Sequence, residues 1–165
     1  MDVSLGIGHT TAMKKKGRIQ RMIEPDTIRL LRECDAGVKM GAASIGGVLE
    51  HVRGEDFRRC LDRCKKAHEA LEKELEGLLE KYHDEGKEPP AAAKGMSWLK
   101  TNWKMSLEDS DRTAAGLITD GCGMGVKSLY RYLNQYQAAD ETSRSIARRL
   151  IRLEEQLTAD LRPYL

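Results

Sequence analysis

The fold of this 165-residue chain depends on the stretch Cys34-Asp35-Ala36-Gly37-Val38-Lys39, which returns later as Cys122-Gly123-Met124-Gly125-Val126-Lys127. The two copies share the pattern Cys-x-x-Gly-Val-Lys. The similarity extends outward, since two apolar positions flanking the first copy, Leu30 and Ile45, match Ile118 and Leu133 around the second. Each copy lies in a long helical pattern that is followed by another. We interpret this as a duplicated helix hairpin, and predict an all-α fold in which two hairpins pack as one four-helix bundle.

Apolar residues at intervals of three and four define the first hairpin. Its first helix is expected to start near Pro25, because proline suits the first helical turn, and to end at Gly54. Its second helix is expected over about Glu55–Tyr82. Four glycines in the first helix each cost roughly 1 kcal/mol relative to alanine, which predicts that another element approaches that face closely: Gly37, Gly41, Gly46 and Gly47.

The second hairpin is predicted from two capping signals, Ser110 or Asp111 before its first helix and Asp140 before its second. Between the hairpins, Pro89-Pro90 breaks the helical pattern, and an amphipathic segment with Trp98 and Trp103 follows. We therefore expect a long crossover that contains a short helix.

Composition divides the chain into a flexible basic N-terminal arm, residues 1–22, and the bundle, residues 23–165. A net charge of +2 with interspersed signs gives no indication of nucleic-acid binding. No apolar run reaches the length of about 20 residues that spans a bilayer. The N-terminus lacks the apolar core of a signal peptide, so a cytoplasmic location is expected. In that compartment the four cysteines are expected as free thiols or metal ligands.

The two hairpins, the crossover and the repeat resemble the ferritin-like superfamily. The chain looks more closely like its branch of uncharacterised bacterial two-hairpin four-helix-bundle domains. The matching features are the Cys-x-x-Gly motif in the first and third helices and the tryptophan-containing crossover, Trp98-Leu99-Lys100 and Trp103-Lys104. The resemblance covers about Pro25 to Leu165 and implies the fold rather than an activity.

Di-iron members of that superfamily use one Glu from each of two helices and a Glu-x-x-His motif from each of the other two. This ligand set is missing from the sequence. Lys65 stands where the glutamate before His68 would be required, and the fourth helix contains no histidine. The resemblance therefore gives no reason to expect ferroxidase or iron-storage activity.

The reactive residues on the predicted core stripes are few. With a helical rise of 1.5 Å per residue, Cys34 falls roughly 15 Å along the bundle axis from the other three cysteines. A four-cysteine zinc site is not expected. A partial zinc or iron site is one interpretation of the remaining candidates, and small buried hydrophobic thiols are the other. The candidate ligands are Cys60, Cys64, His68, Cys122 and Glu154.

His68 and Glu154 occupy equivalent positions in the two hairpins at similar heights. They are interpreted either as a buried acid–base or ligand pair, with Lys39 and Lys127 close by, or as a polar contact at the edge of the core.

Two functions follow from these patterns. The first is a non-enzymatic helical bundle of unknown physiological role that acts through contacts with an unidentified protein partner or as a homodimer. It depends on the absence of a complete catalytic motif. The alternative is a bundle that binds a metal or a small ligand through its core Cys and His residues in stress or redox physiology. No cofactor is predicted for the first function.

Overall fold

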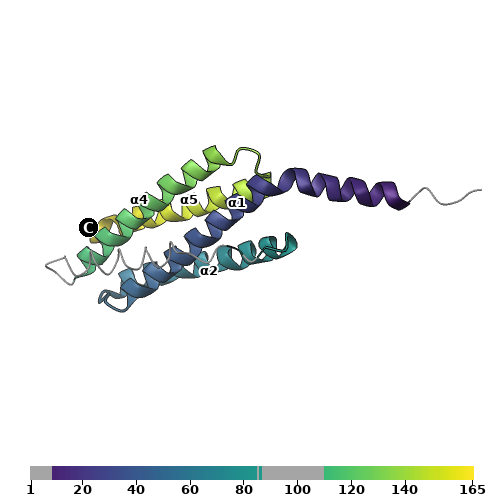
Figure 1. Ribbon diagram of the computed structural model, residues 1–165. Helices are drawn as coiled ribbons and strands as arrows, with labels where there is room; N and C mark the ends of the chain where they lie inside the picture. Colours follow the sequence, from purple (N-terminus) through teal and green to yellow (C-terminus); the bar gives the residue numbers. More distant parts are fainter. Residues whose placement is uncertain (1–8, 85, 87–109) are drawn as a thin grey trace, which may run out of the picture.

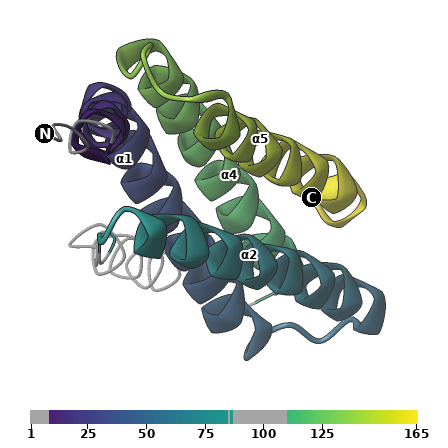
Figure 2. The same cartoon turned by 90° about the vertical axis from the view of Figure 1, so that its right-hand side faces the viewer.

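The computed structural model describes residues 9–84, 86 and 110–165, with side chains from Pro25 onward. This part of the chain is helical and contains no strand. It consists of α1 (His9–Leu49), α2 (Glu55–Lys81), α4 (Asp111–Gln135), α5 (Glu141–Leu161) and the short 3-10 helix η1 (Arg162–Tyr164). The prediction of an all-α bundle of four long helices is confirmed. Figures 1 and 2 show the α1–α2 and α4–α5 hairpins side by side.

The predicted start of the first helix is wrong. α1 begins at His9, and Pro25 lies inside it. The residues before Pro25 are rich in Lys, Arg, Met and Gln, which are strong helix formers, so helix continues despite the proline. This N-terminal part of α1 extends beyond the bundle (Figure 1). The flexibility expected for residues 1–22 stays a prediction.

The predicted caps of the second hairpin are confirmed. The Ser110 hydroxyl accepts a hydrogen bond from the Thr113 backbone N–H at 3.3 Å, and the Asp140 carboxylate accepts one from the Ser143 N–H at 2.8 Å. Each bond satisfies a backbone donor that has no partner within its own helix.

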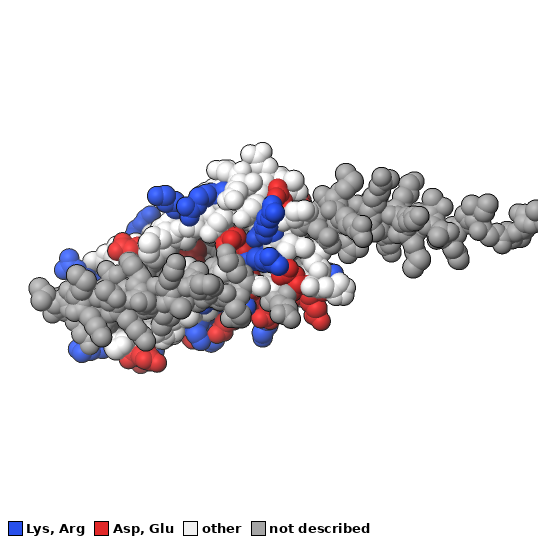
Figure 3. Space-filling view, viewed as in Figure 1, with Lys and Arg blue, Asp and Glu red and all other residues white. Residues whose placement is uncertain are grey.

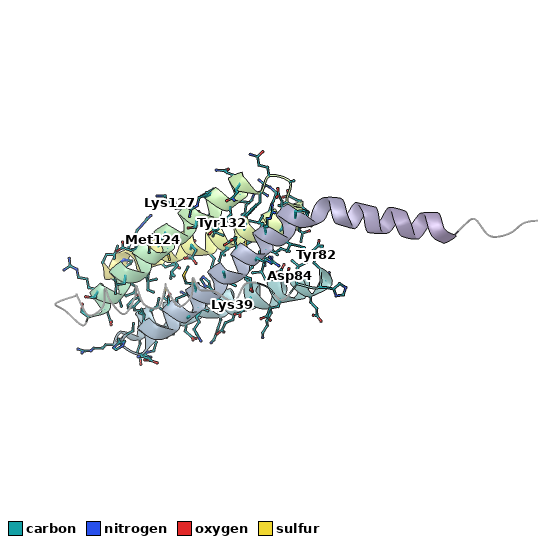
Figure 4. The ribbon with its side chains drawn as sticks, viewed as in Figure 1. Lys39, Tyr82, Asp84, Met124, Lys127 and Tyr132 are labelled. Carbon is teal, nitrogen blue, oxygen red and sulfur yellow. The ribbon has the colours of Figure 1, made fainter. Side chains whose placement is uncertain are left out.

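Side chains at both ends of the bundle tie the hairpins together. At one end, the Asp111 carboxylate accepts from the backbone N–H groups of Arg53 and Gly54, at 2.8 Å each. At the other end, Thr27 accepts from the Asp140 N–H at 2.9 Å. The end of α2 lies beside this second end, where Arg32 donates to Asp84 at 3.0 Å (Figure 4). Residues 84 and 111 are therefore at opposite ends of the bundle. The predicted crossover with Trp98 and Trp103 falls outside the described residues.

The core consists of two apolar clusters along the bundle. One contains Cys34, Val38 and many leucines, and the other contains the remaining three cysteines with Phe57. Buried apolar residues recur at intervals of three and four along all four helices. The separation of Cys34 from the other thiols follows the predicted heights.

The surface carries interspersed Lys/Arg and Asp/Glu side chains over the described part of the face in Figure 3. Of the helices in the described ranges, none is both long and apolar enough to cross a membrane.

Candidate ligand pocket

A buried ion pair links the two hairpins near the middle of the bundle. His68 of α2 donates from Nε2 to Glu154 Oε1 of α5 at 2.7 Å, and from Nδ1 to the Cys64 carbonyl at 2.9 Å. The His68 side chain is fully buried, and that of Glu154 is 12% exposed. The pair therefore joins α2 of one hairpin to α5 of the other.

The environment of His68 favours its charged form. Burial alone would lower the pKa of the imidazole, but the hydrogen bonds with Cys64 and Glu154, together with the Glu154 charge, outweigh it and raise the pKa to about 10. His68 is therefore an imidazolium at neutral pH, and both its N–H groups donate to acceptors of the protein.

Gly41 of α1 makes room for this pair. A Cβ atom at residue 41 would lie 2.6 Å from His68 Nε2 and 3.6 Å from Glu154 Oε1. Real Cβ atoms do not approach nitrogen so closely, so only glycine fits. The close approach expected from the helical glycines is confirmed here. At Gly37 and Gly46 the added atom would make ordinary contacts at 3.5 Å.

Two thiols border the pair. The Cys64 sulfur lies 3.6 Å from His68 Nδ1, and Cys122 of α4 lines the pocket close to the charge of Glu154. Burial, followed by the charge of Glu154, raises the pKa of Cys122 well above its usual value. Cys122 therefore stays protonated at neutral pH and is a poor nucleophile.

An elongated pocket of about 440 Å³ opens above the pair, between α1 and α4. Small-molecule sites have volumes of about 300–1,000 Å³, apolar walls and a few placed polar groups. This pocket fits that description, since most of its surface is apolar. Along α1 it runs from Glu33 to Ile45, which corresponds to about 18 Å of helix.

Each helix contributes to the pocket in a different way. α2 and α5 supply the floor, with His68 and Glu154, while α1 and α4 supply the walls. Figure 4 shows Met124 and Tyr132 on α4. The remaining wall residues include four glycines and several small or apolar side chains: Ala36, Gly37, Met40, Gly41, Ser44, Ile45, Leu117, Ile118, Gly121, Gly125, Ser128 and Leu129.

The predicted site residues are only partly brought together. His68, Glu154 and Cys122 line the pocket, and Cys64 contacts His68 from below. Cys60 lies farther along α2 in the same apolar cluster and does not line the pocket. Burial is also the main reason that the pKa of Cys60 is raised.

In the described residues, no group of three or more His, Cys, Asp or Glu side chains is arranged to hold a metal ion. Zinc or iron binding by the five candidates stays a prediction.

The two lysines of the repeated motif do not join the pair. Lys39 donates to Asp35 at 2.9 Å, and Lys127 is exposed. Figure 4 shows the two lysines on different helices. The interpretation that placed both of them beside His68 and Glu154 is wrong, because each follows its own helix face away from the floor.

Sequence reasoning missed the wall residues Met40, Gly121, Met124 and Tyr132. One signal was present: α1 and α4 both carry glycines four residues apart, Gly37 with Gly41 and Gly121 with Gly125. Glycines at that spacing share one helix face and leave it without side chains. Facing stripes of this kind leave an open space between two helices.

Comparison with protein-family models, with curated proteins and with solved structures found no match for this chain.

Proposed function

We propose that this protein is a non-enzymatic binding protein that holds a small, largely apolar molecule in the pocket between α1 and α4. The observation that carries this proposal is an apolar pocket of about 440 Å³ with a buried His68–Glu154 pair as its floor. Burying two ionised groups is costly unless they are paired, and a pair beside a cavity can orient a ligand.

Binding fits these residues better than catalysis. A general base needs a free lone pair, but both ring nitrogens of His68 donate to other groups. A nucleophilic cysteine needs thiolate character, whereas burial raises the pKa of Cys34 to about 12 and raises that of Cys122 as well.

Two glycines of α4 provide a matched test. A Cβ atom at Gly121 or at Gly123 would meet no heavy atom within 4 Å, but only Gly121 lines the pocket, and Gly123 is exposed. We expect Gly121→Leu to fill the pocket and weaken binding of the neutral fluorescent probe N-phenyl-1-naphthylamine at least tenfold. Gly123→Leu should bind it like the unmodified protein. Equal affinities in the three proteins, or no saturable binding to any, would refute the proposal.

A second candidate function is action through protein contacts, including a homodimer. Its support is that Met124 and Tyr130, both on α4, are 50% and 51% exposed, which is high for large apolar side chains. Light scattering over a range of concentrations tests self-association. A monomer at all concentrations, unchanged by Tyr130→Glu, would count against the dimer.

The remaining expectations are proposals that rest on the sequence. They are the ferritin-like relationship, the crossover with its short helix, the duplication, the cytoplasmic location and a zinc or iron site. Elemental analysis of protein purified under reducing conditions tests the last of these, and substoichiometric metal would remove it.

A further inference from the structure

The hydrogen-bonding groups on the pocket floor restrict the chemistry of its occupant. The His68 imidazolium donates to the Cys64 carbonyl and to Glu154, which leaves it no N–H for a ligand. The Cys122 thiol, which also lines the pocket, is only a weak donor. An ionised carboxylate has about four lone-pair sites and no donor. Glu154 thus keeps acceptor capacity after binding His68, and the strongest hydrogen-bonding group that the floor offers to a ligand is an acceptor.

The position of Glu154 lets a ligand reach it. Its carboxylate lies between the two helices that form the walls, since a Cβ atom at Gly41 would lie 3.6 Å from Oε1 and one at Gly125 would lie 4.0 Å from Cδ. Neither glycine carries a side chain that would cover the carboxylate. An occupant of the pocket therefore contacts this group directly.

The charges around the pocket agree with the hydrogen-bonding groups. The lining contains two carboxylates, Glu33 and Glu154, one imidazolium, and no lysine or arginine. Beside the wall, the Arg131 guanidinium lies 5.8 Å from the centre of the Tyr132 ring, and Arg131 is exposed. With His68 charged, the lining carries one net negative charge. An anion would meet two carboxylates and an imidazolium that is already paired.

We infer that the occupant of the pocket is a lipophilic amine, an apolar molecule carrying one ammonium group that donates to Glu154. The inference rests on the binding function proposed above. An ammonium has three donors and no acceptor, which complements a floor of acceptors. Hydrogen bonds between charged groups are roughly twice as strong as neutral ones. The apolar walls accommodate the remainder of the molecule.

Three molecules with the same phenylbutyl body distinguish the effect of charge from that of apolar contact: 4-phenylbutylamine, 4-phenylbutan-1-ol and 5-phenylpentanoate. Each competes with N-phenyl-1-naphthylamine for the full-length protein at pH 7. We expect the amine to bind about tenfold more tightly than the alcohol, and the carboxylate to bind most weakly. If the alcohol binds as well as the amine, or the carboxylate binds best, the inference is overturned while the binding function stands. If neither the probe nor any of the three binds, both fail.

Glutamine variants test which carboxylate causes the preference for the amine over the alcohol. Glu154→Gln keeps the shape and an acceptor for His68 but removes the charge, so the amine-to-alcohol preference should fall from about tenfold to near one. Glu33→Gln, at the end of the pocket, should reduce the preference by less. It also provides a test that leaves the buried pair intact. A preference unchanged in both variants would overturn the inference.

Discussion

In the first copy of the Cys-x-x-Gly-Val-Lys motif, Cys34 and Val38 are fully buried in a leucine-rich cluster. In the second copy, Cys122 contacts Glu154 beneath the pocket and Val126 is only partly buried. The cysteine of the motif therefore lies in a closed core in the first copy and borders the pocket in the second, whereas the motif glycines of both copies, Gly37 and Gly125, line the pocket. The shared motif places these residues on the same helix face in both copies, but the packing of the surrounding helices determines what that face contacts.

The residues that lie between the shared positions of the motif differ most clearly in burial. Asp35 and Ala36 of the first copy are buried, whereas the corresponding Gly123 and Met124 are exposed. Asp35 pairs with Lys39, four residues later on the same helix. A buried carboxylate fixes the first lysine in place, and a glycine at the equivalent position leaves the second lysine in solvent.

The largest expected effect concerns pH and the pair beneath the pocket. Folding raises the pKa of His68 from about 6.5 in the unfolded chain to about 10. The contribution of the pair to the free energy of unfolding is therefore fully present below pH 6.5. This contribution is lost as the pH rises through 10. Between pH 6.5 and 8.5, before the thiols titrate, the free energy of unfolding should fall by up to about 1.4 kcal/mol per pH unit.

Urea denaturation at several pH values measures this slope. The His68→Gln variant is the control, because it lacks the titrating group. If the slope in that interval is the same in both proteins, the buried imidazolium is ruled out.

The next largest effect is expected at the two lysines of the repeated motif. Lys39→Ala leaves the Asp35 carboxylate, 1% exposed, without its salt-bridge partner, and should destabilise the protein by about 3 kcal/mol. Lys127→Ala changes an exposed side chain and should alter stability by less than about 0.5 kcal/mol. Chemical denaturation of the two variants makes the comparison. Similar losses would show that the two copies are equivalent after all.

Two glycines that face the floor from opposite walls should respond with opposite signs. Gly41→Ala places a Cβ atom 2.6 Å from His68 Nε2, which cannot move without losing its 2.7 Å bond, so we expect about 2 kcal/mol of destabilisation. Gly125→Ala meets nothing closer than 4.0 Å and should stabilise α4 by up to about 1 kcal/mol. Thermal unfolding measures both, and a stabilising Gly41→Ala would contradict the close approach of α2 to α1.

The smallest expected difference lies between the two motif cysteines. Cys34→Ser introduces a hydroxyl into an apolar cluster and should cost about 2 kcal/mol. Cys122 lines the pocket beside Glu154, whose carboxylate can accept from a serine hydroxyl, so Cys122→Ser should cost about 0.5 kcal/mol. Urea midpoints are sensitive enough for this comparison. Equal costs would mean that Glu154 does not accept a hydrogen bond from residue 122.

Local sequence patterns predicted the structural features that depend on residues close together in the chain. The apolar stripes follow from helical periodicity, and the caps at Ser110 and Asp140 follow from side-chain chemistry. The start of α1 was wrong because one proline was weighed above the long stretch of helix formers before it.

The pocket could not be derived in the same way. Its volume depends on the distance between α1 and α4, which is set by how both hairpins pack and not by either sequence stretch. Tyr132 and Met124 gave no signal, because aromatic and thioether side chains on a helix are equally compatible with a core or a cavity wall. The glycines of α1 were interpreted only as sites of close approach. Gly121 of α4, which borders open space, was not part of that interpretation.

Methionine methyl NMR tests the pocket most directly, because Met40 of α1 and Met124 of α4 line it from opposite walls. The protein is labelled with [13C-methyl]methionine, the two signals are assigned with Met40→Leu and Met124→Leu, and 4-phenylbutylamine is added. We predict that both signals shift together and saturate at one affinity, and that Gly121→Leu abolishes the shifts. Saturable binding that leaves both methyl signals unmoved, or no binding at all, would contradict a ligand pocket above His68 and Glu154.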